Sequence, residues 1–168
     1  MMDMDRSFNI GRIRSGLALL LSLLICATAL RLGSTLTTPN LGWYAGLAKP
    51  DFNPPNWVFP VAWTTLFCLM AVSLWLVVRA SGGWIASNRA LLPFGVQLVL
   101  NVAWSYAFFA HQNPFAGVCV IIALIAAIIW TIVAFARRDR LAAWLLVPYL
   151  GWVMFATALN VTIWRLNA

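Results

Sequence analysis

The chain has very few acidic or titratable side chains. Only 9% of its 168 residues are charged, four are aspartate or glutamate, and one is histidine. Asp3 and Asp5 lie close to the amino terminus, and Asp51 and Asp139 fall between hydrophobic runs. No predicted membrane helix therefore contains an acid, and this excludes a paired-carboxylate site or a proton relay for general acid–base catalysis.

Patterns for binding metal or phosphate are also missing. Cys26, Cys68 and Cys119 stand on three different hydrophobic runs, so their spacing predicts neither a metal site nor a disulfide framework. There is no glycine loop of the phosphate-binding type. His111 is the only histidine that could ligate a haem iron, and we expect it in a short loop, at the end of the third helix away from the first loop. We therefore expect no metal site and no required cofactor.

Hydrophobic residues make up 63% of the chain, and its mean hydropathy is +0.88. Soluble domains are roughly 45–50% apolar and about 25% charged. Five apolar segments each reach about the 20 residues that a helix needs to cross a bilayer, and helices satisfy their own backbone groups there. The sequence predicts an all-α membrane protein, a bundle of five transmembrane helices over residues 13–168 after an amino-terminal tail, 1–12. The predicted helices are 13–36, 57–78, 91–109, 115–136 and 141–166.

The first connection, residues 37–56, is long, and it is unusually rich in aromatic residues and proline. From Trp43 to Trp63 the chain carries three Trp, one Tyr, two Phe and four Pro, with Lys49 and Asp51 as the only charged side chains. Proline fixes φ and removes a backbone donor, so we expect this segment to form neither ordinary helix nor sheet. A rigid aromatic loop beside an apolar bundle favours a flat, largely apolar ligand.

Basic residues are distributed unevenly between the two ends of the predicted bundle. By the positive-inside rule the richer end is cytoplasmic, which places the amino terminus inside a bacterial cell membrane and the aromatic loop outside. An outer membrane is the alternative location, and there the rule has no such meaning. The basic residues that give the net charge of +7 lie at the ends of hydrophobic runs, so they indicate membrane anchoring and not nucleic-acid binding. The amino-terminal end holds Arg6, Arg12, Arg14, Arg79, Arg89, Arg137, Arg138 and Arg140, and the other end holds Arg31, Lys49 and Arg165.

The first segment has a second interpretation. Arg12 and Arg14, followed by an apolar run and the small residues 27–29, also match a cleavable signal peptide. We favour a first transmembrane helix because its run is long enough to span the bilayer.

Polar and aromatic residues form stripes on two of the predicted helices. Residues three and four apart share a helix face, and polar side chains inside a bilayer face the bundle interior or a cavity. Trp63, one turn into the second helix, completes a set that can enclose a flat ring. The amides also fit a second role, as hydrogen-bonding contacts between helices. The stripe on the third helix is Gln97, Asn101, Trp104, Ser105 and Phe108, and that on the fifth is Tyr149, Trp152, Ala156 and Asn160.

Three motifs on three segments together resemble the translocator protein / tryptophan-rich sensory protein family (TspO/MBR). The resemblance runs in order from about residue 15 to 166 and leaves the amino-terminal tail uncovered. It implies a five-helix bundle that binds tetrapyrroles such as protoporphyrin IX, and aromatic drug-like ligands, in a pocket capped by the first loop. The motifs are Trp43-Tyr44, Lys49-Pro50, Pro54-Pro55, Trp57-Val58-Phe59-Pro60 and Trp63; Gln97, Asn101, Trp104 and Ser105; and Pro148-Tyr149, Trp152, Phe155-Ala156 and Leu159-Asn160.

The resemblance also implies roles for single residues. Pocket positions of the family match Tyr44, Pro54, Asn101, Trp104, Ser105 and Ala156. Some bacterial members are described as breaking down porphyrin in light, and the two tryptophans involved match Trp63 and Trp152. Mitochondrial members bind cholesterol, but the tail 158–165 lacks the tyrosine of the proposed sterol motif, so cholesterol is a less favoured ligand.

Three functions remain open from the sequence. We favour a membrane receptor or sensor that binds porphyrins, with haem as a further candidate ligand, and that regulates or transports them. The first alternative is a light- and oxygen-dependent enzyme that degrades porphyrin. The second is a transporter of small molecules or sterols, although no intramembrane acid is available to couple it to protons.

Rows of small residues on the third and fourth predicted helices fit two roles, packing inside the bundle or contact between two copies of the chain. The row on the fourth helix is Cys119, Ala123, Ala127 and Thr131. Small side chains spaced by four let helices approach closely. The predicted homodimer row is Gly95, Val99, Ala103 and Ala107.

Overall fold

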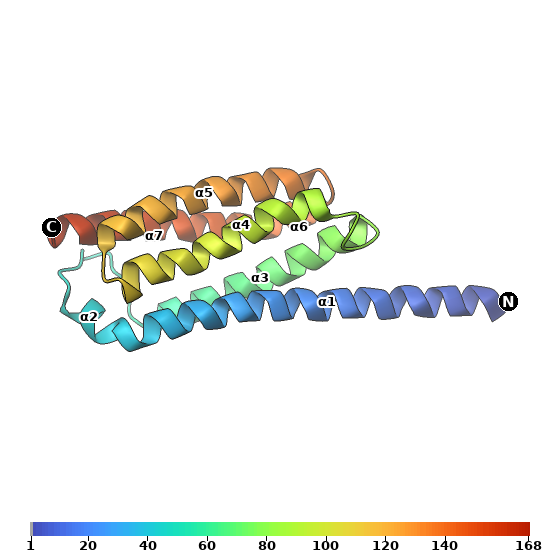
Figure 1. The fold of residues 1–168 in the computed structure, drawn as a ribbon, viewed down its shortest axis with the longest axis horizontal. Coiled ribbons are helices and arrows are strands. Elements are labelled where there is room, and N and C mark those ends of the chain that lie inside the picture. The colour runs from blue at the N-terminus through green and yellow to red at the C-terminus, as the bar shows by residue number, and fades with distance from the viewer. Residues whose placement is uncertain (1) are drawn as a thin grey trace.

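The computed structural model describes the backbone of residues 2–168 and the side chains of residues 14–168. Five helical segments are long and apolar enough to cross a membrane (Figure 1). This confirms the predicted all-α membrane fold. The two termini lie at opposite ends of the bundle, as five crossings require. The spans are Arg14–Gly46, Val58–Ala80, Asn88–Ala110, Pro114–Ala136 and Arg140–Leu166.

Helix α1, Met2–Thr37, begins well before the predicted start at residue 13. It leads through η1, Thr38–Asn40, into the short helix α2, Leu41–Gly46. The expectation of a wholly non-helical first loop is therefore wrong for its first half. The reason is positional: Pro39 lies in the first turn of η1, where a missing donor is harmless, and the next proline is Pro50. Within the first connection, only residues 47–57 lack a helix.

The remaining helices start and stop at recognisable signals. α3, Val58–Ala80, ends in a turn where Gly82 and Gly83 have φ of 82° and 137°, which glycine adopts without strain. α5, Pro114–Ala136, starts with Asn113, whose side chain accepts from the Ala116 backbone N–H, and with proline at its first position.

Two of the predicted helices contain a break. α4, Asn88–Ser105, continues into the π-helical turn η2, Tyr106–Ala110. The last predicted helix is divided into α6, Arg140–Leu145, and α7, Val147–Leu166. Asp139 caps α6, and Pro148 lies in the first turn of α7. The first of these breaks contains Phe108 and Phe109, which line the site described below.

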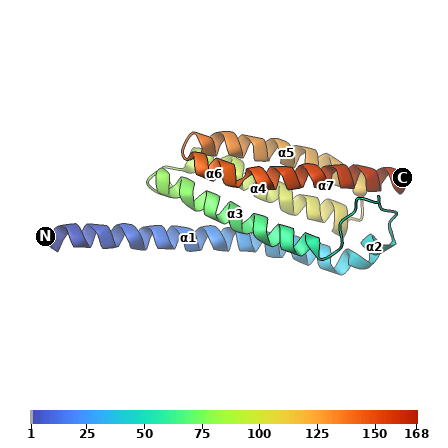
Figure 2. The same ribbon diagram turned by 180° about the vertical axis from the view of Figure 1, so that it is seen from behind.

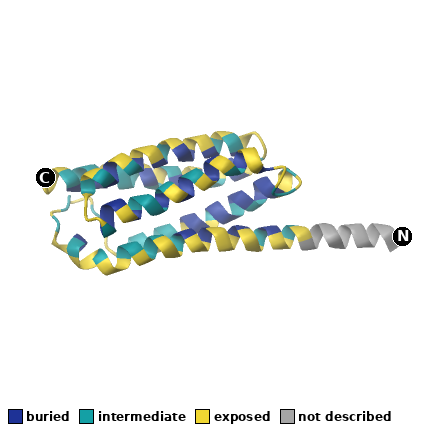
Figure 3. Ribbon diagram, viewed as in Figure 1, coloured by how far each residue is buried: buried dark blue, intermediate teal, exposed yellow. Residues whose placement is uncertain are grey.

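The helices form one bundle (Figure 2). α1 packs against α3 and α4, α5 against α4 and α7, and α3 against α6. Buried residues face the interior, while the outward faces are exposed (Figure 3). At the end away from the first loop, Ser73 donates to the Ala142 carbonyl over 2.7 Å and the Phe94 and Phe135 rings stack 5.6 Å apart in the core.

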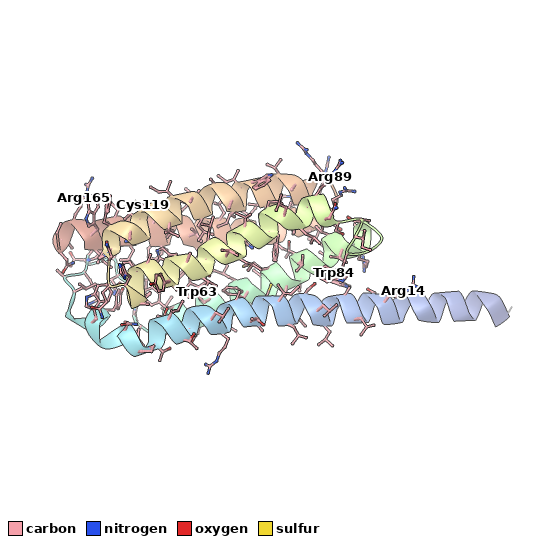
Figure 4. The ribbon with its side chains drawn as sticks, in the orientation of Figure 1. Arg14, Trp63, Trp84, Arg89, Cys119 and Arg165 are labelled. Carbon is pink, nitrogen blue, oxygen red and sulfur yellow. The ribbon has the colours of Figure 1, made fainter. Side chains whose placement is uncertain are left out.

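The described charged side chains separate between the two ends of the bundle. Arg14 and Arg89 lie toward the end opposite the first loop, together with Trp84, whereas Arg165 lies at the loop end (Figure 4). Arg6 and Arg12, which also entered the charge count, lie outside the side chains that are described.

His111 lies at the loop end, so the expectation that it stands away from the first loop is wrong. It directly follows η2, and the neighbouring Gln112 side chain donates to Asn40 over 3.2 Å. Because α4 runs back toward the loop, its carboxyl end meets the carboxyl end of α1.

The predicted dimer row does not stay on one outer face. Gly95 and Val99 are exposed, Ala103 is half-buried and Ala107 is buried. Positions four apart in an α-helix drift by about 40° per step, so a row of four turns gradually toward the core.

Candidate ligand-binding cavity

A cavity of about 840 Å³ lies beneath the first loop, in the half of the bundle nearest that loop. Four walls surround it, formed by α1, α3, α4 with η2, and α7. Its loop side carries Tyr44, Lys49, Asn53 and Asn56. Binding sites for drug-sized ligands measure roughly 300–1,000 Å³, so the volume suits one such molecule.

Aromatic rings form the deeper walls. The Trp63 ring centroid lies 6.4 Å from that of Trp104 and 6.5 Å from that of Trp152, and the Trp63 and Trp152 planes are nearly perpendicular at 84°. Trp104 stacks on Phe108 at 5.6 Å. Three indoles from three different helices thus meet around one space, where each ring offers a face or an edge to a bound π-system.

Hydrogen bonds orient some of these walls. Trp104 Nε1 donates to Asn160 Oδ1 over 3.0 Å, and Asn160 Nδ2 donates to the Pro114 carbonyl over 2.9 Å. Asn101 Nδ2 donates to the buried hydroxyl of Tyr149 over 2.9 Å. By contrast, Trp152 Nε1 is a buried donor without a protein partner.

Most of the residues proposed from the sequence meet at this cavity, and three do not. Gln97 is buried below Asn101, off the wall, and neither polar atom of its amide has a partner. Tyr149 is fully buried behind Asn101. Pro54 lines a separate shallow depression, with Trp152 between it and the cavity. The nine on the wall are Tyr44, Trp63, Asn101, Trp104, Ser105, Phe108, Trp152, Ala156 and Asn160.

Sequence reasoning missed the wall contributed by α1. It consists of Ala27, Leu30, Arg31, Ser34 and Thr37, which share one helix face. Ser34 and Thr37 were a usable signal, because hydroxyls near the end of an otherwise leucine-rich run indicate a face that avoids lipid. Gly33 belongs to the same wall, where a Cβ atom would lie 3.3 Å from Ser105 Oγ.

The π-helical turn η2 was also unforeseen. It contains the adjacent Phe108 and Phe109, which both line the cavity and have exposed fractions of 2% and 9%. Phe109 follows Ser105 by four positions, so it belongs to the same helix face as Phe108. The stripe predicted from the sequence included Phe108 and omitted Phe109.

The described residues offer no metal site. No group of three His, Cys, Asp or Glu side chains among them could hold an ion. His111 stacks on Tyr106 and does not line the cavity, so the described wall offers a tetrapyrrole no histidine as axial ligand.

Comparison with known proteins gives one consistent answer. Residues 18–165 match the TspO/MBR family. The chain is 44% identical over 154 residues to the tryptophan-rich protein TspO of Chlorobaculum tepidum, covering 90% of this chain and 96% of that protein. It is 48% identical over 126 residues to the protein of the same name from Archaeoglobus fulgidus, covering 75% and 80%. Human translocator protein is 39% identical over 130 residues, with 76% of each chain covered. The chain therefore belongs to the TspO/MBR family, and it is an integral, multi-pass membrane protein.

Proposed function

We propose that this protein is a membrane receptor or sensor that binds tetrapyrroles, with protoporphyrin IX as the reference ligand. The observation that carries the proposal is the cavity of about 840 Å³ where Trp63, Trp104 and Trp152 converge. Its relatives include proteins named tryptophan-rich sensory protein, from Cereibacter sphaeroides, and translocator protein.

The chemistry of the walls supports a flat, conjugated ligand. Indole and phenyl rings hold a ring system by stacking and edge contacts, each worth about 0.5–1.5 kcal/mol beyond the buried area. The buried Trp152 N–H has no protein partner, and we propose that it donates one hydrogen bond to the ligand. No resident cofactor is needed for such binding.

Spectral titration tests the proposal directly. Purified protein is titrated with protoporphyrin IX, haem and cholesterol, and porphyrin binding is followed by its absorption and by quenching of tryptophan fluorescence. We expect saturable binding of protoporphyrin IX with one site per chain and weaker binding of cholesterol. Absence of saturable porphyrin binding would refute the assignment.

We further propose that the protein lies in a bacterial cell membrane with its amino terminus in the cytoplasm and the first loop outside. The support is the excess of arginine at the end opposite the loop. In a background without the three native cysteines, Asn53→Cys should react with a membrane-impermeant thiol reagent on intact cells, and Ser87→Cys should not. The reverse pattern would invert the topology.

A second candidate function is light-dependent breakdown of the bound porphyrin. The contact between Trp63 and Trp152 favours it, because an indole held against an excited porphyrin can donate an electron. We expect illumination in oxygen to change the absorption of the bound porphyrin, with no change in the dark. Trp63→Phe combined with Trp152→Phe should suppress this and retain binding. If the double variant bleaches porphyrin as fast as wild type, the light-dependent function is refuted and only the receptor function remains.

A further inference from the structure

The cavity carries positive charge without any negative charge to balance it. Lys49, at the loop, and Arg31, on α1, both line it, and no acidic side chain of the described residues does. A wall of one sign favours a ligand of the opposite sign. The aromatic rings of the cavity explain why it would bind a flat ligand, but they do not explain why two cationic side chains line it.

Lys49 is held in place from several sides. Its Nζ donates to the Ala45 carbonyl and to the Leu47 carbonyl, both over 3.0 Å. It also lies 4.8 Å from the centroid of the Tyr44 ring, within cation–π range. An ammonium group has three donors, so one N–H remains for a ligand.

The Tyr44 ring beneath the ammonium is itself fixed. Its hydroxyl donates to Asn53 Oδ1 over 2.8 Å, and the ring is only 7% exposed. The cation therefore occupies one defined position at the loop side of the cavity, opposite the deeper aromatic walls. Fixing a binding group beforehand reduces the entropy lost on binding.

The carboxyl-terminal end of α7 holds the same segment of the loop. Asn167 Oδ1 accepts from the Ala48 backbone N–H over 2.9 Å, and Asn167 Nδ2 donates to the Ala48 carbonyl over 2.9 Å and to the Ile163 carbonyl over 2.8 Å. The exposed side-chain amide of Asn167 thus hydrogen-bonds both backbone groups of Ala48, the residue that precedes Lys49. These hydrogen bonds join positions 119 residues apart in the chain.

We propose that Lys49 is a specificity-determining residue that binds a carboxylate of the ligand, and that Asn167 positions it through Ala48. The proposal rests on the proposed function and narrows its ligand class to flat aromatic molecules that carry a carboxylate at one edge. Such a ligand places its ring among the tryptophans and its carboxylate at the loop. Arg31 is exposed and adds to the positive potential of the wall.

The test compares two ligands that share one macrocycle and differ at the carboxylates: protoporphyrin IX and its neutral dimethyl ester. Full-length protein is titrated with each in vesicles of zwitterionic lipid, and the ratio of the two dissociation constants is the readout. We expect wild type to prefer the free acid by roughly 3- to 10-fold, as for a partly exposed charge-assisted hydrogen bond. Raising the salt concentration should shrink this ratio.

Variants separate charge from structure. Lys49→Gln keeps N–H donors for Ala45 and Leu47 but removes the charge, so the ratio should fall to about one while ester affinity stays at its wild-type value. Lys49→Arg should retain the preference. Asn167→Leu should lower the ratio to an intermediate value. Arg165→Gln is the matched control, since it removes a cation from the same end that does not line the cavity, and it should leave the ratio unchanged.

The outcomes separate this inference from the function on which it rests. If wild type binds neither ligand, the proposed function fails. If it binds both equally, or if its preference does not respond to salt, carboxylate selection fails while porphyrin binding stands. If Arg31→Gln abolishes the preference and Lys49→Gln does not, the assignment to Lys49 is overturned. A loss of ester affinity in Lys49→Gln equal to its loss of acid affinity would reduce Lys49 to a structural role.

Discussion

The two halves of this bundle use the same kinds of residue for opposite purposes. In the half away from the first loop, Phe94 and Phe135 stack on each other and are almost fully buried. In the loop half, Trp63 and Trp152 meet edge to face and both line the cavity. Aromatic content alone therefore does not distinguish a core from a binding site.

The difference arises from how closely the helices approach. Ser73 of α3 bonds to the Ala142 backbone of α6, which draws these two elements together at one end. At the other end, α3 and α7 face each other across the cavity, both lining its walls. The break at Leu146, between α6 and α7, allows the close contact and the separation within one membrane span. We therefore expect stability to be concentrated in the first half, and the proposed function places ligand recognition in the second.

The largest effect that this comparison predicts is on folding. Phe135 is fully buried, so Phe135→Ala should lower the free energy of unfolding by about 3–5 kcal/mol, the usual loss for removing a buried ring. Trp63→Ala removes a larger ring from the cavity wall and should cost clearly less. Thermal unfolding in one detergent measures both. If Trp63→Ala were the more destabilising of the two, the division between the halves would be wrong.

Much of the fold could be predicted from the sequence. The five apolar runs were enough to predict five transmembrane helices, because a single segment can satisfy its own backbone hydrogen bonds inside a bilayer only as a helix. The length needed to cross the bilayer then gives the approximate extent of each membrane span. The breaks could not be read in this way. The π-helical turn at Tyr106–Ala110 leaves the hydrophobic pattern intact, and α2 precedes the prolines that were expected to exclude a helix.

The candidate site was predictable where polar residues interrupt an apolar run. Asn101 stood out on the third helix for that reason. Gln97 stood out equally but lies off the wall, because helix periodicity gives a residue's face and not its depth relative to a cavity. The position of Asn167 beside Ala48 depends on how the chain folds back, and no local pattern encodes it.

A smaller change should disturb the cavity wall from behind. Gly117 of α5 lies outside the cavity, but a Cβ atom there would lie 2.8 Å from Asn160 Oδ1 and 3.0 Å from the Phe108 ring. Gly117→Ala should displace Asn160 and weaken its bond with Trp104, costing about 1–3 kcal/mol in stability and reducing porphyrin affinity as well.

The control for this variant is Gly16→Ala on α1. A Cβ atom at Gly16 meets nothing within 4 Å, so the unfolding midpoint should not fall. Equal behaviour of the two variants in unfolding and in porphyrin titration would mean that Asn160 does not fix the position of Trp104.

The smallest predicted effect is on binding alone. Trp152→Leu removes one stacking surface and the buried N–H from the cavity wall, and Asn101→Leu removes one amide. Losing about 0.5–1.5 kcal/mol of aromatic contact should weaken porphyrin binding roughly 2- to 12-fold. Trp130→Leu is the matched control, because Trp130 is 48% exposed on α5 and does not line the cavity. Spectral titration should separate Trp152→Leu and Asn101→Leu from Trp130→Leu while all three proteins unfold cooperatively. Unchanged affinity in both cavity variants would place the ligand elsewhere on the bundle, because Trp152 and Asn101 both line the proposed cavity.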